Sequence, residues 1–135
     1  MDAHQETDRR IAEMVRACYW DRDINCARTT LYCMSRLFDL PLDPQLDRAA
    51  IGLNGAGRMG CQCGLLEGAL LFLGIHASFL GKTEKEVCAV CGRYTAAFQK
   101  HFGGIDCRVL RPGGVFVYVV PSEKHLWELK QVLYD

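Results

Sequence analysis

Apolar residues recur at helical spacing along most of the chain, and this pattern predicts a mostly α protein. We expect the first helix to begin near Thr7 or Asp8, because an apolar stripe with i, i+3, i+4 spacing follows. The members of this stripe are Ile11, Met14, Val15, Cys18 and Tyr19. A second helix is expected after Asn25, a residue type that caps helix N-termini. Cys26 and Cys33 share one face of it, since seven residues nearly complete two helical turns.

The middle of the chain predicts a central helix that follows a glycine-rich loop. A short helix over residues 44–51 leads into the loop, which spans residues 52–60. Residues 64–75 are then apolar almost all round, which is typical of a helix buried on every side. Gly64 and Gly68 lie four apart on it, so another backbone can approach that face closely.

The last third of the chain predicts one more long helix, followed by an extended segment and a short helix. Thr83 and Glu86 form a capping-box pair, and Gly103 ends the helix that they open. Residues 115–120 are β-prone, and a short helix is expected after Ser122. Together the elements predict a single domain over residues 1–135, a compact helical bundle around residues 64–75 with one short C-terminal extended segment.

Charge and hydropathy exclude several classes of function. The 16 basic and 16 acidic residues cancel, so the chain lacks the basic surface that binds nucleic acid or anionic membranes. The longest apolar stretch, residues 65–73, is shorter than the ~20 residues of a membrane span. Residues 1–8 are polar and acidic, unlike a signal peptide. We therefore expect a cytoplasmic protein without direct membrane insertion or nucleic-acid binding.

The glycine-rich loop matches the G-x-G-x-x-G pattern of nucleotide-binding loops at Gly55, Gly57 and Gly60. That fingerprint needs a strand before the loop and an acidic residue about 20 positions later. A helical segment precedes this loop, and Leu80, Gly81 and Lys82 stand where the acid would be. We therefore expect the loop to serve close backbone contact, with amides that can face negatively charged sulfur.

Eight cysteines in 135 residues carry the chemistry that can be read from this sequence. Without an export signal, such cysteines are more often metal ligands or redox thiols than disulfides. Cys61 and Cys63 precede the central helix, whose N-terminal dipole should lower a thiol pKa. Cys88 and Cys91 lie three apart on one helix, and the two pairs together suit a metal or an iron–sulfur cluster. Two others, Cys18 and Cys33, are expected to pack in the core.

Three pieces of the chain resemble the redox-active C_GCAxxG_C_C family of bacteria and archaea. They are Asn25-Cys26, the glycine-rich loop and residues 63–68, and the resemblance covers residues 25–107. Cys26, Cys63 and Cys107 match the first three signature cysteines of the family, while Gly64 and Gly68 match its motif glycines. Two positions depart from the pattern: Leu65 replaces the motif alanine, and no cysteine follows position 107 to serve as the fourth.

The resemblance implies a redox role, with an iron–sulfur cluster or thiol/disulfide chemistry serving electron transfer or redox sensing. It also implies a redox partner, with a membrane transport system as the candidate. The residues predicted to hold a metal or cluster are Cys26, Cys63, Cys107, Cys61, Cys88 and Cys91, with Gly64 beside them. If the three matched cysteines share one centre, their sulfurs should lie about 3.5–7 Å apart.

Other interpretations stay open at this point. Cys61, or the pair Cys88 and Cys91, can supply the missing fourth ligand. Zinc accepts four thiolates as an iron–sulfur cluster does, so a non-catalytic module with structural zinc or a carried soft metal is the alternative. Disulfide chemistry usually uses Cys-x-x-Cys at a helix start in a βαβ setting, whereas Cys88 and Cys91 lie inside a predicted helix with no parallel sheet. We therefore place an iron–sulfur cluster first, thiol–disulfide chemistry second and zinc third. The sequence defines no enzymatic reaction, and a homodimer is compatible with it.

Overall fold

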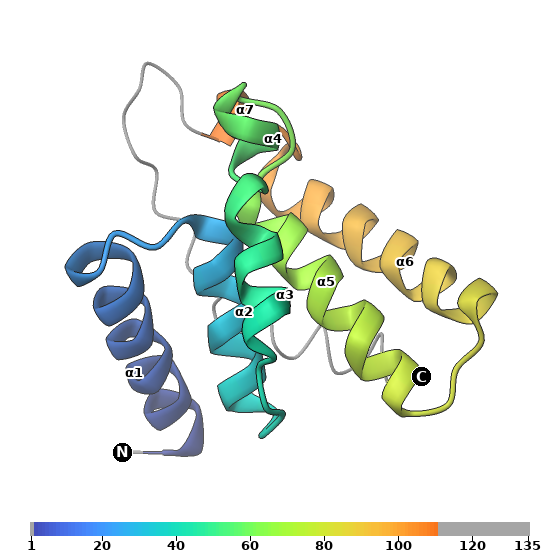
Figure 1. Cartoon of the computed structure of the whole chain (residues 1–135), viewed down its shortest axis with the longest axis horizontal. Coiled ribbons are helices and arrows are strands. Elements are labelled where there is room, and N and C mark those ends of the chain that lie inside the picture. The colour runs from blue at the N-terminus through green and yellow to red at the C-terminus, as the bar shows by residue number, and fades with distance from the viewer. Residues whose placement is uncertain (1, 111–135) are drawn as a thin grey trace.

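The computed structural model describes residues 2–110, and this part of the chain is mostly α, as predicted (Figure 1). Its elements are α1 (Ala3–Val15), the π-helical η1 (Arg16–Asp21), α2 (Cys26–Leu37), α3 (Pro44–Ala49), the 3-10 helix η2 (Ala50–Gly52), α4 (Gly55–Arg58), α5 (Gly64–Phe79), α6 (Glu84–Phe102) and α7 (Cys107–Leu110). The extended segment and the final helix predicted after residue 110 lie outside the described residues. Within residues 2–110, strand-like pairing is confined to one isolated β-bridge.

The first helix begins at Ala3, four residues earlier than the apolar stripe predicts. The Asp2 side chain accepts a hydrogen bond from the Gln5 amide at 2.8 Å, and the Gln5 side chain accepts one from the Asp2 amide at 3.1 Å. This capping box supports a polar first turn, which an apolar pattern cannot reveal. The stripe itself is placed as predicted, because Ile11, Val15 and Cys18 are buried.

The core is built on the contact between α2 and α5, which is the most extensive helix pair of the described chain (Figure 1). Two glycines of α5 make it close. A Cβ on Gly64 would lie 2.8 Å from the Cys26 Cβ, and one on Gly68 would press on the Ala27 carbonyl oxygen. Real Cβ atoms do not tolerate such distances, so only glycine allows α2 to lie this near. The predicted close approach at these two glycines is confirmed.

On its other side α5 packs against α6, and the two helices form a hairpin (Figure 1). The predicted capping box at Thr83 and Glu86 is present, and α6 ends where Gly103 adopts a left-handed φ of 80°. The large side chains of this layer are fully buried: Phe72 from α5, and Tyr94 and Phe98 from α6. The central helix thus holds together the layers that precede and follow it in sequence.

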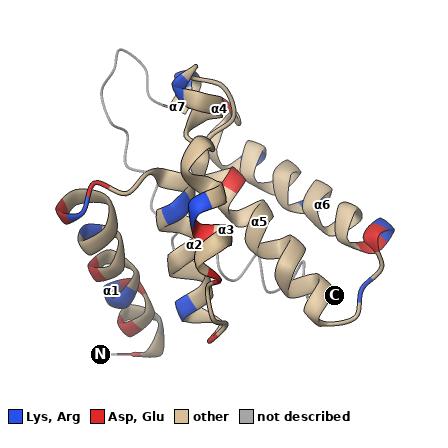
Figure 2. Ribbon diagram, in the orientation of Figure 1, with Lys and Arg blue, Asp and Glu red and all other residues tan. Residues whose placement is uncertain are grey.

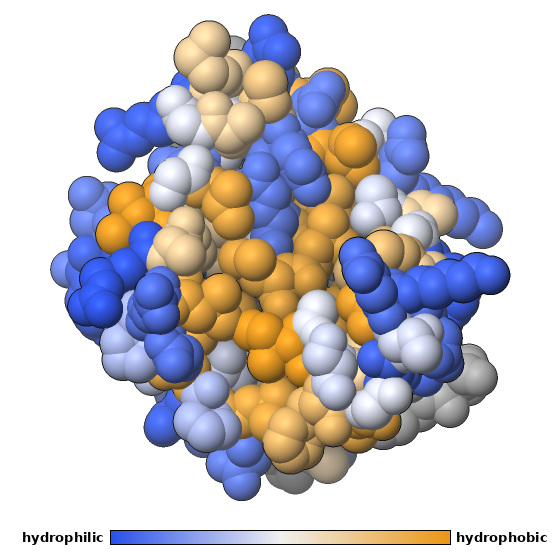
Figure 3. Space-filling view, turned by 45° about the vertical axis from the view of Figure 1, so that its right-hand side comes forward, coloured by the Kyte–Doolittle hydropathy of each residue, from blue (hydrophilic) through white to orange (hydrophobic). Residues whose placement is uncertain are grey.

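The second half of α5 departs from the expectation of a helix buried on every side. The helix continues to Phe79, and Ile75 and Phe79 are 41% and 75% exposed. Figure 2 shows α5 as an almost uncharged helix, and Figure 3 shows apolar residues gathered across the face turned towards the reader. The continuous apolar sequence therefore identifies the central helix correctly, but it predicts more burial for the second half of that helix than the structure shows. Among the described helices, none combines the length and hydropathy that crossing a membrane requires.

Replacing Gly68 by alanine should destabilise the fold, because its Cβ would push α2 away from α5. We expect a loss of about 1–3 kcal/mol in the free energy of unfolding, measured by chemical denaturation. Gly74→Ala is the matched control on the same helix, since a Cβ there meets nothing within 4 Å. It should gain about 0.5–1 kcal/mol from the better helix propensity of alanine. Equal effects of the two substitutions would contradict the close α2–α5 contact.

Candidate functional site

The N-terminus of α5 is approached by a short antiparallel pairing between two segments distant in sequence. Gln62 pairs with Asp106. On one side of this pair the Cys63 amide donates to the Ile105 carbonyl at 2.7 Å, and on the other the Cys107 amide donates to the Cys61 carbonyl at 2.5 Å. Antiparallel pairing therefore sets Cys107 directly opposite Cys61. Since side chains alternate along an extended segment, Cys61 and Cys63 leave it on the same side.

The glycine-rich loop before this pairing contains a left-handed turn. Gly55, Ala56, Gly57 and Arg58 all have positive φ, between 55° and 69°. Amides after the turn close it by donating to the carbonyls of its first residues, as in Met59 to Gly55 at 3.1 Å. A left-handed conformation costs about 1–2 kcal/mol for each residue that carries a Cβ. The turn thus stores backbone strain at the two positions that are not glycine.

This loop packs directly on the segment that carries Cys107. A Cβ on Gly55 would lie 3.5 Å from the Cys107 Cβ, and one on Gly60 would lie 2.5 Å from the Arg108 Cγ. The Arg108 amide and Nε both donate to the Gly60 carbonyl, at 3.0 and 3.2 Å. Figure 1 shows α4 and α7 together at one end of the molecule. The glycines therefore serve close backbone contact, as the sequence predicts.

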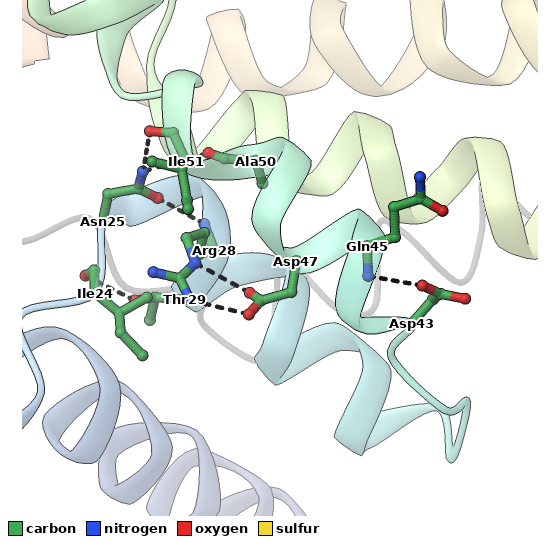
Figure 4. Close-up of polar contacts among 9 residues, drawn as sticks. All are labelled: Ile24, Asn25, Arg28, Thr29, Asp43, Gln45, Asp47, Ala50 and Ile51. Carbon is green, nitrogen blue, oxygen red and sulfur yellow. Dashed lines mark hydrogen bonds and ion pairs between the residues drawn. The ribbon is translucent and has the colours of Figure 1, made fainter.

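Cys26 reaches the same end of the fold as the first residue of α2. Its Cβ faces the bare side of Gly64, which directly follows Cys63 in the chain. Asn25 fixes this helix start: its Oδ1 accepts from the Arg28 amide at 2.9 Å, and its Nδ2 donates to the Ile51 carbonyl at 2.9 Å (Figure 4). The predicted N-cap is thus confirmed, and it also ties α2 to η2.

An ion pair holds α3 against the same turn of α2. The Arg28 guanidinium donates two hydrogen bonds to Asp47, from Nε at 3.1 Å and from Nη2 at 2.9 Å (Figure 4). This pairing lowers the pKa of the Asp47 carboxyl and raises the pKa of Arg28. Cys26 therefore stands on a helix start that is supported from two sides.

Burial, not the helix dipole, decides the acidity of the Cys63 thiol. Loss of solvent raises its pKa above the ordinary value, and the amides of Leu65 and Leu66 at the start of α5 lower it only in part. Negative charge on Cys107 and on Glu67 adds to the rise. The prediction that the helix N-terminus leaves Cys63 with a lowered pKa is therefore wrong. The charge effect also shows that Cys63 and Cys107 are electrostatic neighbours.

Glu67 is a buried carboxyl one turn into α5. Its Oε2 is enclosed and has no hydrogen-bond partner among the described residues. Burial alone raises the pKa of this carboxyl, because the charged form loses water that nothing replaces. Glu67 is not among the predicted site residues, and its signal in the sequence is that it is the one charged residue in an otherwise apolar helix.

The remaining cysteines lie elsewhere. Cys88 is exposed and Cys91 packs against the core, both in the first half of α6. Eleven residues separate Cys91 from the end of that helix at Phe102, a rise of about 16 Å. The structure therefore does not bring this pair to the pairing beside α5. Cys18 and Cys33 are buried in the core, as predicted, and burial raises the pKa of Cys33 to about 12.

The described side chains do not converge as a metal centre requires. Within residues 2–110, no three His, Cys, Asp or Glu side chains lie together in a group that could hold a metal ion. No disulfide joins any of the eight cysteines, all of which lie in this range. Cys26, Cys61, Cys63 and Cys107 thus share one end of the fold as thiols, and the predicted iron–sulfur cluster and zinc site stay predictions.

Comparison with known families identifies the family to which this chain belongs. A family model described as "Putative redox-active protein (C_GCAxxG_C_C)" matches residues 24–129, which is most of the chain. The chain belongs to this family, as its resemblance at Cys26, Cys63 and Cys107 indicates. No curated protein and no solved structure matches it.

Thiol alkylation of the native protein should follow the burial of the cysteines. At mildly alkaline pH, Cys88 should react with iodoacetamide first, because it is exposed. Cys33 should stay unmodified until the chain unfolds, since it is fully buried and its pKa is raised to about 12. Mass spectrometry of peptides taken over time gives the order, and early labelling of Cys33 would contradict the described core.

Glu67→Gln should flatten part of the pH dependence of stability. Because the pKa of Glu67 is raised in the folded state, the native protein keeps a proton that the unfolded chain releases above its ordinary pKa near 4.5. Stability from this group is full below that pH and is lost as pH rises through the folded pKa. Denaturation curves across this range should show that the variant loses less stability with rising pH.

His76 provides the internal check, because its effect has the opposite sign. Burial lowers its pKa below the ordinary 6.5, so stability from this group falls as pH drops through the folded pKa. Glu67→Gln should leave that slope in place. A variant with the same pH profile as the parent protein would show that Glu67 titrates normally.

Proposed function

We propose that this chain is a thiol–disulfide redox protein in which Cys107 and Cys63 form and break a disulfide. The observation that carries the proposal is the antiparallel pairing of residues 61–63 with residues 105–107, which puts Cys107 opposite Cys61 and diagonal to Cys63, with both on its side of the pairing. A disulfide needs only two neighbouring thiols, whereas a cluster or zinc needs three or four that converge. The arrangement of the described side chains favours the first.

The two thiols differ in environment, and this difference suggests their roles. Cys107 is half-buried and lines a surface cavity, so a substrate can reach it. Cys63 is buried and its pKa is raised, which suits a thiol that reacts only with a neighbouring sulfur. Cys107 thus attacks first and Cys63 resolves the mixed disulfide. The pair loses two electrons and two protons to an acceptor disulfide, which becomes two thiols.

Cys61 and Cys26 stand beside this pair in different ways. Cys61 lies directly opposite Cys107 across the pairing and is the competing partner for a disulfide. Cys26 packs on Gly64 from the adjoining helix start. If Cys61 takes the place of Cys63, the chemistry is unchanged and only the resolving residue differs.

A bound metal or cluster is the second candidate, because four cysteines from three segments share this end of the fold. Thiolates of Cys26, Cys61, Cys63 and Cys107 are the ligand type that iron–sulfur clusters and zinc prefer. Their placement does not form such a centre among residues 2–110. Iron, sulfide and zinc measured in anaerobically purified protein decide between the two candidates.

The test of the disulfide is a set of single cysteine-to-serine variants titrated in redox buffers. The parent protein should form one intramolecular disulfide, detected by mass spectrometry after the remaining thiols are alkylated. Cys107→Ser should abolish it, and Cys63→Ser should stop the reaction at a mixed disulfide on Cys107. The reason is that the attacking thiol then has no partner to displace the substrate half.

Cys88→Ser is the matched control, since Cys88 is exposed on α6 and remote from the pairing. It should form the same disulfide as the parent protein. A disulfide that survives in Cys107→Ser would contradict the proposal. Stoichiometric iron and sulfide that are lost in Cys63→Ser and Cys107→Ser would establish the cluster in its place.

A further inference from the structure

The cavity that gives a substrate access to Cys107 measures about 460 Å³, and the other residues that line it have no role in the proposal above. Small-molecule sites in proteins commonly measure about 300–1,000 Å³, so its size suits a small ligand. Its wall combines η1 and the α2 start with the left-handed turn and α7. The lining includes Asp23, Arg58, Gly60, Cys107 and Arg108.

The lining is polar and carries more positive than negative charge. Arg58 and Arg108 face a single carboxylate, that of Asp23. Neither arginine forms an ion pair with another described residue. Arg108 uses its Nε for the Gly60 carbonyl at 3.2 Å, which fixes the side chain and leaves its two terminal amino groups for a ligand. A planar guanidinium matches a carboxylate through two parallel hydrogen bonds.

The position of Arg58 also points to a ligand. Its φ of 69° is strained for a residue with a Cβ, and glycine would fit this turn without that cost. Strained backbone is characteristic of binding sites, where the side chain that it presents is needed. In this turn the strained residue presents a cation to the cavity that Cys107 lines.

We propose that this cavity binds a small disulfide that carries carboxylate groups, with a carboxylate on Arg58 and Arg108 and a sulfur at Cys107. This inference rests on the proposed thiol–disulfide function, for which it supplies the substrate class. The cations explain recognition and the thiol explains reaction, and both lie in one wall. A ligand with carboxylates but no disulfide bond binds without reacting.

The reaction balances without any further reagent. The Cys107 thiolate attacks one substrate sulfur, the substrate S–S bond breaks, and one half leaves as a thiolate that takes up a proton. The bond formed is a mixed disulfide between Cys107 and the other half. Cys63 then attacks the Cys107 sulfur, releases the second half as a thiol and leaves the protein disulfide. The substrate gains two electrons and two protons, and the two cysteines lose them.

The experiment measures how fast the reduced protein reacts with three small disulfides of different charge. The probes are dithiodiglycolate, which is a dianion, bis(2-hydroxyethyl) disulfide, which is neutral, and cystamine, which is a dication. We expect the dianion to react faster than the neutral probe, and the dication to react slowest. Arg58→Gln and Arg108→Gln should each lower the rate for the dianion about three- to tenfold, the loss of one partly exposed charged hydrogen bond, and lower the rate for the neutral probe by less.

Arg36→Gln is the matched control, because it removes the same charge at the opposite end of α2 from Asn25. It should change no rate. Equal rates for the three probes, or equal losses in all three arginine variants, would overturn the inference while leaving the proposed function intact. Reaction with none of the probes would instead count against the thiol function.

A second measurement does not depend on redox chemistry. Thiodiglycolate has the two carboxylates of the first probe joined by an unreactive thioether. It should raise the melting temperature of the parent protein and of Cys107→Ser, and it should not stabilise Arg58→Gln or Arg108→Gln. Stabilisation that persists in both arginine variants would place carboxylate binding elsewhere and overturn the inference.

Discussion

The close contact of α5 with α2 at Gly64 and Gly68 determines how the cysteine-bearing end of the fold is assembled. A Cβ at either glycine would overlap α2. The contact sets where α2 begins relative to α5, and so it brings Cys26 to the start of the central helix. Side chains of ordinary size would hold the helices farther apart and would separate the cysteines that the two helix starts carry. Packing thus determines the chemistry of this end of the molecule.

The positions of the glycine-rich loop and of the pairing at residues 61–63 depend on that contact. Cys63 is the last residue before α5, so its position follows from the helix, and the pairing then draws Cys107 to it. Gly55 and Gly60 let the loop lie directly on the Cys107 segment. The arrangement uses backbone hydrogen bonds and bare glycine surfaces rather than large side chains. As a result a cavity stays open beside Cys107, while Cys63 is buried.

The helices could be predicted from the sequence because their signals are local. Asn25 and Thr83 cap the helices expected of them, and the apolar stripe of the first helix is buried as expected. The long-range pairing of residues 61–63 with 105–107 could not be predicted, since a contact of so few residues leaves no periodic pattern in the sequence. Arg58 and Arg108 cannot be recognised in the sequence for a similar reason, because only the folded chain puts them in one cavity.

The Cys63 thiol shows where a local rule fails. The helix N-terminus does act on it, through the amides of Leu65 and Leu66, but the enclosure of the side chain acts more strongly in the opposite direction. Burial depends on what packs around a residue, and this cannot be read from the spacing of residues along the sequence. The family resemblance located Cys26, Cys63 and Cys107, whereas their environments came only from the fold.

The pairing beside Cys63 is a single isolated bridge with one backbone hydrogen bond on each side, and the Arg108 amide adds one more to Gly60. So small a unit can separate locally without unfolding the α5–α6 hairpin, at a free energy well below that of global unfolding. The buried thiol is therefore protected by an equilibrium between closed and open forms, not by permanent enclosure. Its rate of reaction with bulky reagents in solution is then set by how often the bridge opens, while a neighbouring sulfur needs no opening at all.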